Sequence, residues 1–237
     1  TFTPKDPDAE AYIAAVEAAD GEALEQGVRD AYTTFVVSCK DNGIWPFMNQ
    51  CVLTMGARTV AGAKVPLRGS APTTAATNYS RTAGLKVDAN QIDTNYPNNT
   101  DPRDSKHFAL YTTTPGGVYK GVIQNVGGGT SFLEVYIYAG GTAVTLNSSS
   151  GSTLPQATAN TTMLIGGTRY SSSNVIYRIN NGNHGRTESS TAPQSQDIGI
   201  SRTSGDIYDG RILGWSFGRH INPNLGTLET LFATLKS

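Results

Sequence analysis

The carboxyl groups in the central part of this 237-residue chain decide which hydrolytic chemistry the sequence could support. Glycoside hydrolysis requires two carboxyl groups that flank the scissile bond, one as a protonated acid and one as a base or nucleophile. Between Gly43 and Gly218 only two glutamates occur, Glu134 and Glu188, and no second acid follows Glu134 along its expected strand. The sequence therefore predicts that the protein is not an enzyme, with a glucanase-like hydrolase as a less favoured alternative.

Tyrosine and asparagine side chains offer a second chemistry, which is carbohydrate binding without catalysis. Such binding asks only for an aromatic platform and a few amide or carboxylate groups that form hydrogen bonds. Strand tyrosines and loop asparagines that could supply them are Tyr136, Tyr138, Tyr177, Asn147 and Asn183. The alternative is that the tyrosines are ordinary strand residues with half-buried rings.

Metal and cofactor chemistry has little support in the sequence. The three histidines, His107, His184 and His220, have no partner at the spacing of zinc or iron ligands. No phosphate-cradling loop or dinucleotide-binding motif is present. We expect no cofactor and no transition-metal site, and a calcium ion bound through Asp101, Asp104 or neighbouring carbonyls is the one alternative.

The two cysteines, Cys39 and Cys51, are too few for a disulfide scaffold or a zinc site. One interpretation is a pair of buried thiols. The other is a single disulfide that ties the end of a helix to the strand after it, because a loop of this size closes easily.

Overall composition excludes several kinds of partner. The formal net charge is −1 and the sequence pI is near 6.3, so no strongly basic face for nucleic acid is expected. No run of about 18 apolar residues occurs, so membrane insertion is not expected. At 38% hydrophobic residues, the chain has enough apolar side chains to fold.

Residues 1–43 are expected to form an N-terminal helical segment. Asp6 and Pro7 make an N-cap and first-turn proline pattern, and Asp41-Asn42-Gly43 supplies a C-terminal stop. Apolar residues recur between these points at helical spacing, so each helix has one apolar face. Helices this short are not stable alone, and the segment packs either on the rest of the chain or on a partner.

Charge is divided unevenly along the chain. Residues 1–40 contain eight acidic and three basic residues, whereas the remainder is net basic. We therefore expect the acidic helical segment to lie against a basic patch, on its own body or on the next subunit. Salt should weaken such a contact if it is exposed.

Residues 44–237 are expected to form a β-sandwich with a closing C-terminal helix. Short β-rich runs recur roughly every ten residues between clusters of Gly, Asn, Ser and Pro. Asn181-Gly182 marks a tight hairpin, and the stripe of leucines from Leu225 to Leu235 predicts a helix docked on the sheet. The predicted fold class is mainly β.

Two motifs connect this pattern to a known fold family. The segment from Asp209 to Arg219, followed by a short helix, resembles the last strand and closing helix of concanavalin A-like, laminin-G-like sandwiches. The hairpin at Asn181-Gly182 is similar to one that these domains carry in the same relative position. The resemblance implies a jelly-roll sandwich, and fold alone does not give function.

A second resemblance covers most of the chain. The order of Lys40-Asp41-Asn42-Gly43-Ile44-Trp45, Gly84 to Asp88, and Ile92-Asp93-Thr94 resembles that of lectin-like domains in structural proteins of tailed bacteriophages. It implies a non-enzymatic virion protein, either a capsid decoration or a tail or fibre appendage. Its partners would be other virion proteins or copies of itself, and it would be exposed on a particle assembled in the host cytoplasm. The alternative is an adhesin or receptor-binding domain that binds host cell-surface glycan.

Overall fold

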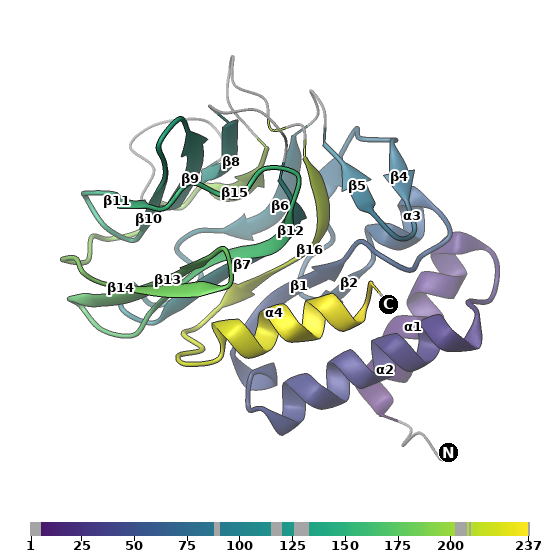
Figure 1. Ribbon diagram of the computed structural model, residues 1–237. Helices are drawn as coiled ribbons and strands as arrows, with labels where there is room; N and C mark the ends of the chain where they lie inside the picture. Colours follow the sequence, from purple (N-terminus) through teal and green to yellow (C-terminus); the bar gives the residue numbers. More distant parts are fainter. Residues whose placement is uncertain are drawn as a thin grey trace.

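The computed structural model describes residues 6–87, 91–114, 120–125, 133–201, 208 and 210–236. Its helices lie at the two ends of the described chain and in one short connection (Figure 1): α1 (Pro7–Asp20), α2 (Gln26–Asp41), the 3-10 turn η1 (Trp45–Phe47), α3 (Val60–Ala63) and α4 (Leu225–Thr234). Among the residues described, no helix combines the length and apolar character that crossing a bilayer requires.

Two antiparallel sheets make up the rest of the described structure. The nine-stranded sheet has the order β14 (Gly182–Thr187), β13 (Asn174–Ile179), β12 (Thr162–Arg169), β7 (Lys106–Thr113), β16 (Arg211–Gly218), β1 (Met48–Leu53) and β2 (Pro66–Arg68), with β5 (Gly84–Lys86) beside β16 and β4 (Tyr79–Ser80) beside β5. The seven-stranded sheet has the order β11 (Ser152–Leu154), β10 (Gly141–Leu146), β9 (Leu133–Tyr138), β8 (Lys120–Asn125), β15 (Asp197–Ile200), β6 (Ile92–Pro97) and β3 (Thr73–Thr74). The fold is mainly β, a sandwich with helices at its N- and C-terminal ends, as predicted.

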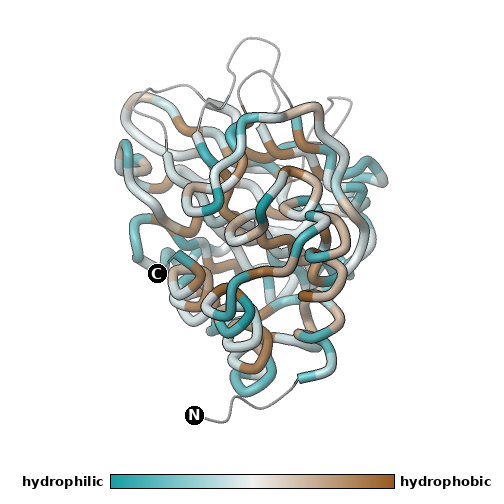
Figure 2. The backbone as a smooth tube through the Cα atoms, turned by 90° about the vertical axis from the view of Figure 1, so that its right-hand side faces the viewer, coloured by the Kyte–Doolittle hydropathy of each residue, from teal (hydrophilic) through white to brown (hydrophobic). Residues whose placement is uncertain are grey.

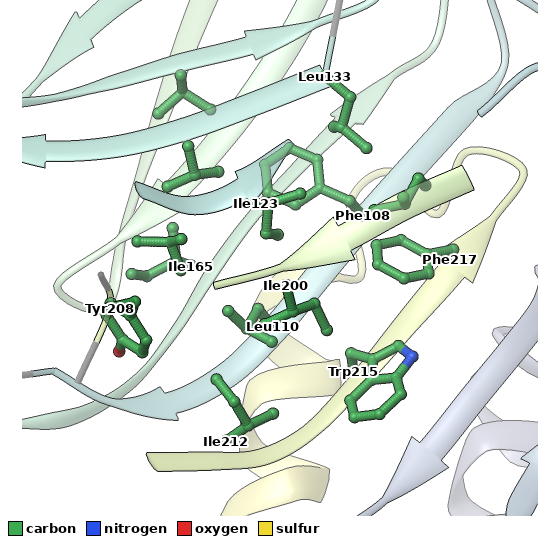
Figure 3. Close-up of a cluster of buried hydrophobic side chains, with 14 of the residues drawn as sticks. Phe108, Leu110, Ile123, Leu133, Ile165, Ile200, Tyr208, Ile212, Trp215 and Phe217 are labelled. Atoms are coloured by element: carbon green, nitrogen blue, oxygen red, sulfur yellow. The ribbon is translucent and has the colours of Figure 1, made fainter. Parts of the chain in front are cut away.

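The core between the two sheets follows from the alternation of side chains along each strand. The nine-stranded sheet contributes large side chains such as Phe108, Trp215 and Phe217, and the seven-stranded sheet contributes smaller ones such as Ile123 and Leu133 (Figure 3). Each of these side chains is at most 1% exposed. Burying one contributes about 1.5–3 kcal/mol, so this layer is the main source of stability.

The opposite face of the nine-stranded sheet is covered by helices. The ring of Phe232 in α4 stacks on Tyr111 of β7 with 5.6 Å between centroids, and it also contacts Phe35 of α2 at 5.3 Å. Hydrophobic and hydrophilic residues are interspersed along the helices (Figure 2), as expected when one face of each is buried. The helical segment therefore packs on its own β body, one of the two alternatives that the sequence left open.

Two tyrosine hydroxyls fix α1 and α2 to the end of β1. Tyr12 donates to the carbonyl of Leu53 at 3.4 Å, and Tyr32 donates to the carbonyl of Met55 at 2.5 Å. The two rings meet edge to face at 5.0 Å. Buried hydroxyls need partners, and these carbonyls supply them.

Ion pairs join the acidic helical segment to basic residues of the body. The guanidinium of Arg58 lies 3.0 Å from Glu25 and 3.6 Å from Glu22, and Arg81 also binds Glu25. Hydrogen bonding from Arg81 lowers the pKa of Glu25 to about 2. The contact of acidic segment with basic body is thus made within one chain, and because its groups are largely exposed it contributes little to stability.

The carboxylate of Asp20, at the end of α1, organises the turn that leads into α3. It accepts hydrogen bonds from the backbone N–H groups of Arg58 and Thr59 at 2.7 and 2.8 Å, and from the Thr59 hydroxyl at 2.7 Å. A Cβ atom at Gly62 would lie 2.2 Å from an oxygen of this carboxylate. The turn therefore requires a residue without a side chain at Gly62.

Gly62→Ala should lower the free energy of unfolding by about 1–3 kcal/mol, because the added methyl group collides with Asp20 and its hydrogen bonds. The matched control is Gly27→Ala, a helical position where a Cβ would have no atom within 4 Å. That variant should be neutral or more stable by up to about 1 kcal/mol. Urea unfolding of both measures the difference, and equal stability of the two variants would contradict this account of the turn.

The two cysteines are buried and free in the structure. Burial raises the pKa of the Cys39 thiol to about 12, and that of Cys51 also rises well above its ordinary value. Both thiols are therefore protonated at neutral pH, and protonated thiols are poor nucleophiles.

Candidate functional site

The outer face of the seven-stranded sheet carries the tyrosines that the sequence singled out. Along β9 the apolar residues point into the core, whereas Glu134, Tyr136 and Tyr138 are partly exposed on the other side. The Tyr138 hydroxyl donates to the hydroxyl of Thr153 at 3.2 Å and lies close over Gly141 of the neighbouring strand. The Tyr138 side chain thus extends across β10 toward β11.

Strand register places further polar side chains in a row across this face. Thr145 of β10 lies opposite Glu134 of β9. Beyond Glu134, Gln124 of the next strand, β8, is paired with Gly199 of β15. Gly199 is paired in turn with Asp93 of β6. The row offers an amide and two carboxylate groups, Gly199 between Gln124 and Asp93 contributes no side chain, and Thr145 at the β10 end is buried.

Two carboxyl groups of this sheet, those of Glu134 and Asp197, are less acidic than usual. Burial raises the pKa of Glu134, and burial together with the nearby charge of Asp93 raises that of Asp197. No basic side chain is found among the described side chains of the seven strands. The carboxylates of Glu134 and Asp93 are acceptors for the hydroxyl groups of a ligand.

The separation between Glu134 and Asp93 decides whether these two acids could act as a catalytic pair. Glu134 and Asp93 lie on β9 and β6, with β8 and β15 between them. Three strand spacings amount to about 14 Å, whereas glycosidases place their two carboxyl groups about 5 to 9.5 Å apart. Asp93 is therefore too far from Glu134 to act with it. The neighbouring strands β8 and β10 contain no acidic residue, so Glu134 has no acidic partner there either.

Two of the predicted glycan-binding residues lie inside the protein. Tyr177 is fully buried, and its hydroxyl donates to a carboxylate oxygen of Glu188 at 2.9 Å. Asn147 is also buried; its amide donates to the carbonyl of Arg103 at 2.9 Å, and its φ of 49° is in the left-handed region. This burial corrects the expectation that Tyr177 offers an exposed ring and Asn147 a free amide.

Asn183, the fifth predicted residue, lies on a different sheet from the tyrosines. It is exposed on the edge strand β14, where its side-chain oxygen accepts a hydrogen bond from Arg178 at 2.9 Å. Of the five predicted residues, the structure brings together only Tyr136 and Tyr138. Gln124 and Asp93 were missed, and their alternation along strands was the one signal that could have found them.

The alternative of a calcium site at Asp101 is not supported by the geometry. Its buried carboxylate accepts hydrogen bonds from Asn49 at 2.6 Å and Tyr96 at 2.8 Å, and the ammonium group of Lys106 lies 3.7 Å away. In the part of the chain that is described, no group of three or more His, Cys, Asp or Glu side chains could hold a metal. The ammonium group of Lys106 already neutralises the carboxylate that a calcium ion would need.

The buried imidazole of His107 is held in its neutral form. Its Nδ1 lies 2.6 Å from the carbonyl of Arg219, and its Nε2 lies 2.8 Å from the hydroxyl of Ser216. A carbonyl only accepts, so Nδ1 carries the proton and Nε2 accepts from Ser216. Burial lowers the pKa of His107 to about 4.

This depressed pKa predicts a pH dependence of stability. The unfolded chain binds a proton at His107 below about pH 6.5, whereas the folded chain does not until about pH 4. The contribution of His107 to the free energy of unfolding should therefore be fully present above pH 6.5. The free energy of unfolding should fall by about 2 kcal/mol between pH 7 and pH 5 on account of this residue. Urea unfolding of the protein and of His107→Gln at both pH values measures the term, and parallel pH profiles would refute it.

No family model matches the sequence, and a search of curated proteins finds no relative. Solved structures do match. A Trypanosoma rangeli sialidase in complex with sialic acid has a TM-score of 0.55 at 9% identity, over 86% of this chain and 38% of the sialidase. Domain 4 of an extracellular arabinanase from Geobacillus stearothermophilus, in complex with arabinotriose, has a TM-score of 0.53 at 8% identity, over 77% of this chain and 98% of that domain.

The binding domain of botulinum neurotoxin serotype D is a third similar structure, with a TM-score of 0.56 at 9% identity over 79% of this chain and 52% of that domain. This chain spans about two fifths of the sialidases it matches. At these identities the likeness establishes the β-sandwich fold, which proteins crystallised with bound sugars share.

Proposed function

We propose that this protein binds glycan on the outer face of the seven-stranded sheet, with Tyr136 and Tyr138 as the aromatic platform. The observation that carries the proposal is the placement of both rings on one side of β9, partly exposed and in line with Glu134. A tyrosine offers an apolar ring face for the C–H groups of a sugar and a hydroxyl for hydrogen bonding.

The polar groups beside the tyrosines suit sugar hydroxyls. Glu134 and Asp93 accept hydrogen bonds, and the amide of Gln124 both donates and accepts. The similar structures that hold sialic acid or arabinotriose support a sugar ligand through their fold alone. Because the described side chains of the face include acids and no base, we propose a neutral glycan and not a sialylated one.

We further propose that binding occurs without hydrolysis. Glu134 has Thr145 opposite it on β10, and Gln124 follows Ile123, the partner of Val135, on β8. Neither neighbour is a carboxyl group that could act as the second member of a catalytic pair. The role as a virion component stays a prediction that rests on the sequence resemblance.

Tyr136→Ala should weaken binding of a neutral oligosaccharide about tenfold, because it removes one ring from the platform. A glycan array of neutral and sialylated oligosaccharides identifies the ligand, and calorimetry with the tightest neutral binder gives the Kd. Tyr170→Ala is the matched control, since Tyr170 is 40% exposed and lies outside the seven-stranded sheet. The control variant should bind like the parent protein.

Three results would overturn the proposal. They are an array with no bound glycan at high protein concentration, a Tyr136→Ala variant with unchanged Kd, and an equal loss of affinity in Tyr170→Ala. Preference for sialylated glycans would refute the proposed neutrality of the ligand while leaving glycan binding intact.

A further inference from the structure

A groove of about 450 Å³ lies between helix α1 and the edge strand β2, with η1 and β1 also contributing. It is separate from the face described above, because β2 is the last strand of the nine-stranded sheet. Its size falls in the range of small-molecule sites in proteins. The glycan proposal does not use this groove.

One wall of the groove is apolar. It is formed by Tyr12 from α1 and by Pro66 and Leu67 from β2, of which Tyr12 is buried and the other two are partly exposed. On the helix side the lining includes Ala11, whose small side chain leaves room for a ligand. This wall can hold the hydrocarbon part of a ligand.

The groove also contains a guanidinium group that lacks an acidic partner. Arg68 lies over the ring of Trp45, with 4.9 Å between the guanidinium carbon and the ring centroid, and it donates one hydrogen bond to the Trp45 carbonyl. In the described part of the chain, no carboxylate forms an ion pair with Arg68. Its remaining N–H groups are therefore donors available to a ligand.

The acidic residue that lines the groove, Asp8, is already paired with a lysine. Lys40 lies 5.2 Å from the centroid of the same Trp45 ring, but its ammonium group is paired with Asp6 at 2.8 Å and with Asp8 at 2.5 Å. Asp8 lines the groove, and its carboxylate forms an ion pair with Lys40. Arg68 is the one basic side chain among the described residues that line the groove, so it is the group that an anionic ligand would contact.

We propose that this groove binds a small organic carboxylate with an apolar body. The planar fork of Arg68 takes the carboxylate through paired hydrogen bonds, the geometry in which arginine binds carboxylates best. The apolar body lies along Tyr12, Pro66 and Leu67. Trp45 orients the guanidinium group through its ring and its carbonyl.

The two tryptophans of the chain make the site directly observable. Trp45 lines the groove, whereas Trp215 is buried in the core with its indole N–H donating to Gln50. Titration with 4-phenylbutyrate should shift the indole N–H resonance of Trp45 in a ¹H–¹⁵N spectrum and leave that of Trp215 in place. The matched neutral probe, 4-phenylbutyramide, should bind about tenfold more weakly, because it lacks the charge that Arg68 recognises.

Two helix variants test the location of the site without disturbing Arg68. Ala11→Leu places a larger side chain in the groove and should weaken phenylbutyrate binding at least about tenfold. Ala14→Leu is the matched control on the same helix, because Ala14 is exposed and does not line the groove. It should leave the affinity unchanged.

Arg68→Gln completes the test by removing the charge. In this variant phenylbutyrate and phenylbutyramide should bind with equal, weak affinity. The proposal is overturned if phenylbutyrate does not shift the Trp45 resonance, if the amide binds as tightly as the acid to the parent protein, or if Ala11→Leu and Ala14→Leu behave alike. None of these results bears on glycan binding at Tyr136.

Discussion

Burial of both faces of the nine-stranded sheet is the constraint on which the rest of the structure depends. Strand β7 shows it most clearly, because Phe108 and Leu110 pack against the seven-stranded sheet while Ala109 and Tyr111 pack against the helices. A helix layer is needed because Ala109 and Tyr111 would otherwise be exposed. The seven-stranded sheet has no such cover among the described elements, so its outer face is the broad surface left for a ligand.

Polar groups tie the two sheets together at the margins of the apolar core. Gln50 of the nine-stranded sheet donates to the carbonyl of Thr94 in the seven-stranded sheet at 2.5 Å and accepts from the indole of Trp215 at 3.3 Å. At another point Glu188 accepts from Tyr177 of one sheet and Ser152 of the other. Such networks need every member satisfied, which explains why Tyr177 is a structural residue and not an exposed platform.

Local sequence patterns were sufficient for the elements but not for the site. The Asp6-Pro7 cap and the Asn181-Gly182 turn predicted a helix start and a hairpin that the structure contains, because each depends only on adjacent residues. Alternation along β9 distinguishes Tyr136 and Tyr138 from their inward neighbours. The row from Thr145 to Asp93 depends on pairings between strands far apart in sequence, which no local pattern reports.

The burial of Tyr177 and the contact of Arg68 with Trp45 differ in how far the sequence reports them. Alternation along β13 places Tyr177 on the buried side with Val175 and Ile179, whereas along β9 it places Tyr136 on the outer side with Glu134. Trp45 belongs to the segment after α2 that supported the phage resemblance. Its place in a groove depends on the packing of β2 beside α1, which the local sequence does not report.

Hydroxyl-radical footprinting, with and without the tightest neutral oligosaccharide, tests the central claim most directly. If the outer face of the seven-stranded sheet is the binding surface, the ligand should reduce oxidation of Tyr136 and Tyr138 and leave that of Tyr170 unchanged. Protection of Tyr170 or Trp45 with unaltered oxidation of Tyr136 and Tyr138, under conditions where the glycan is bound, would contradict the account.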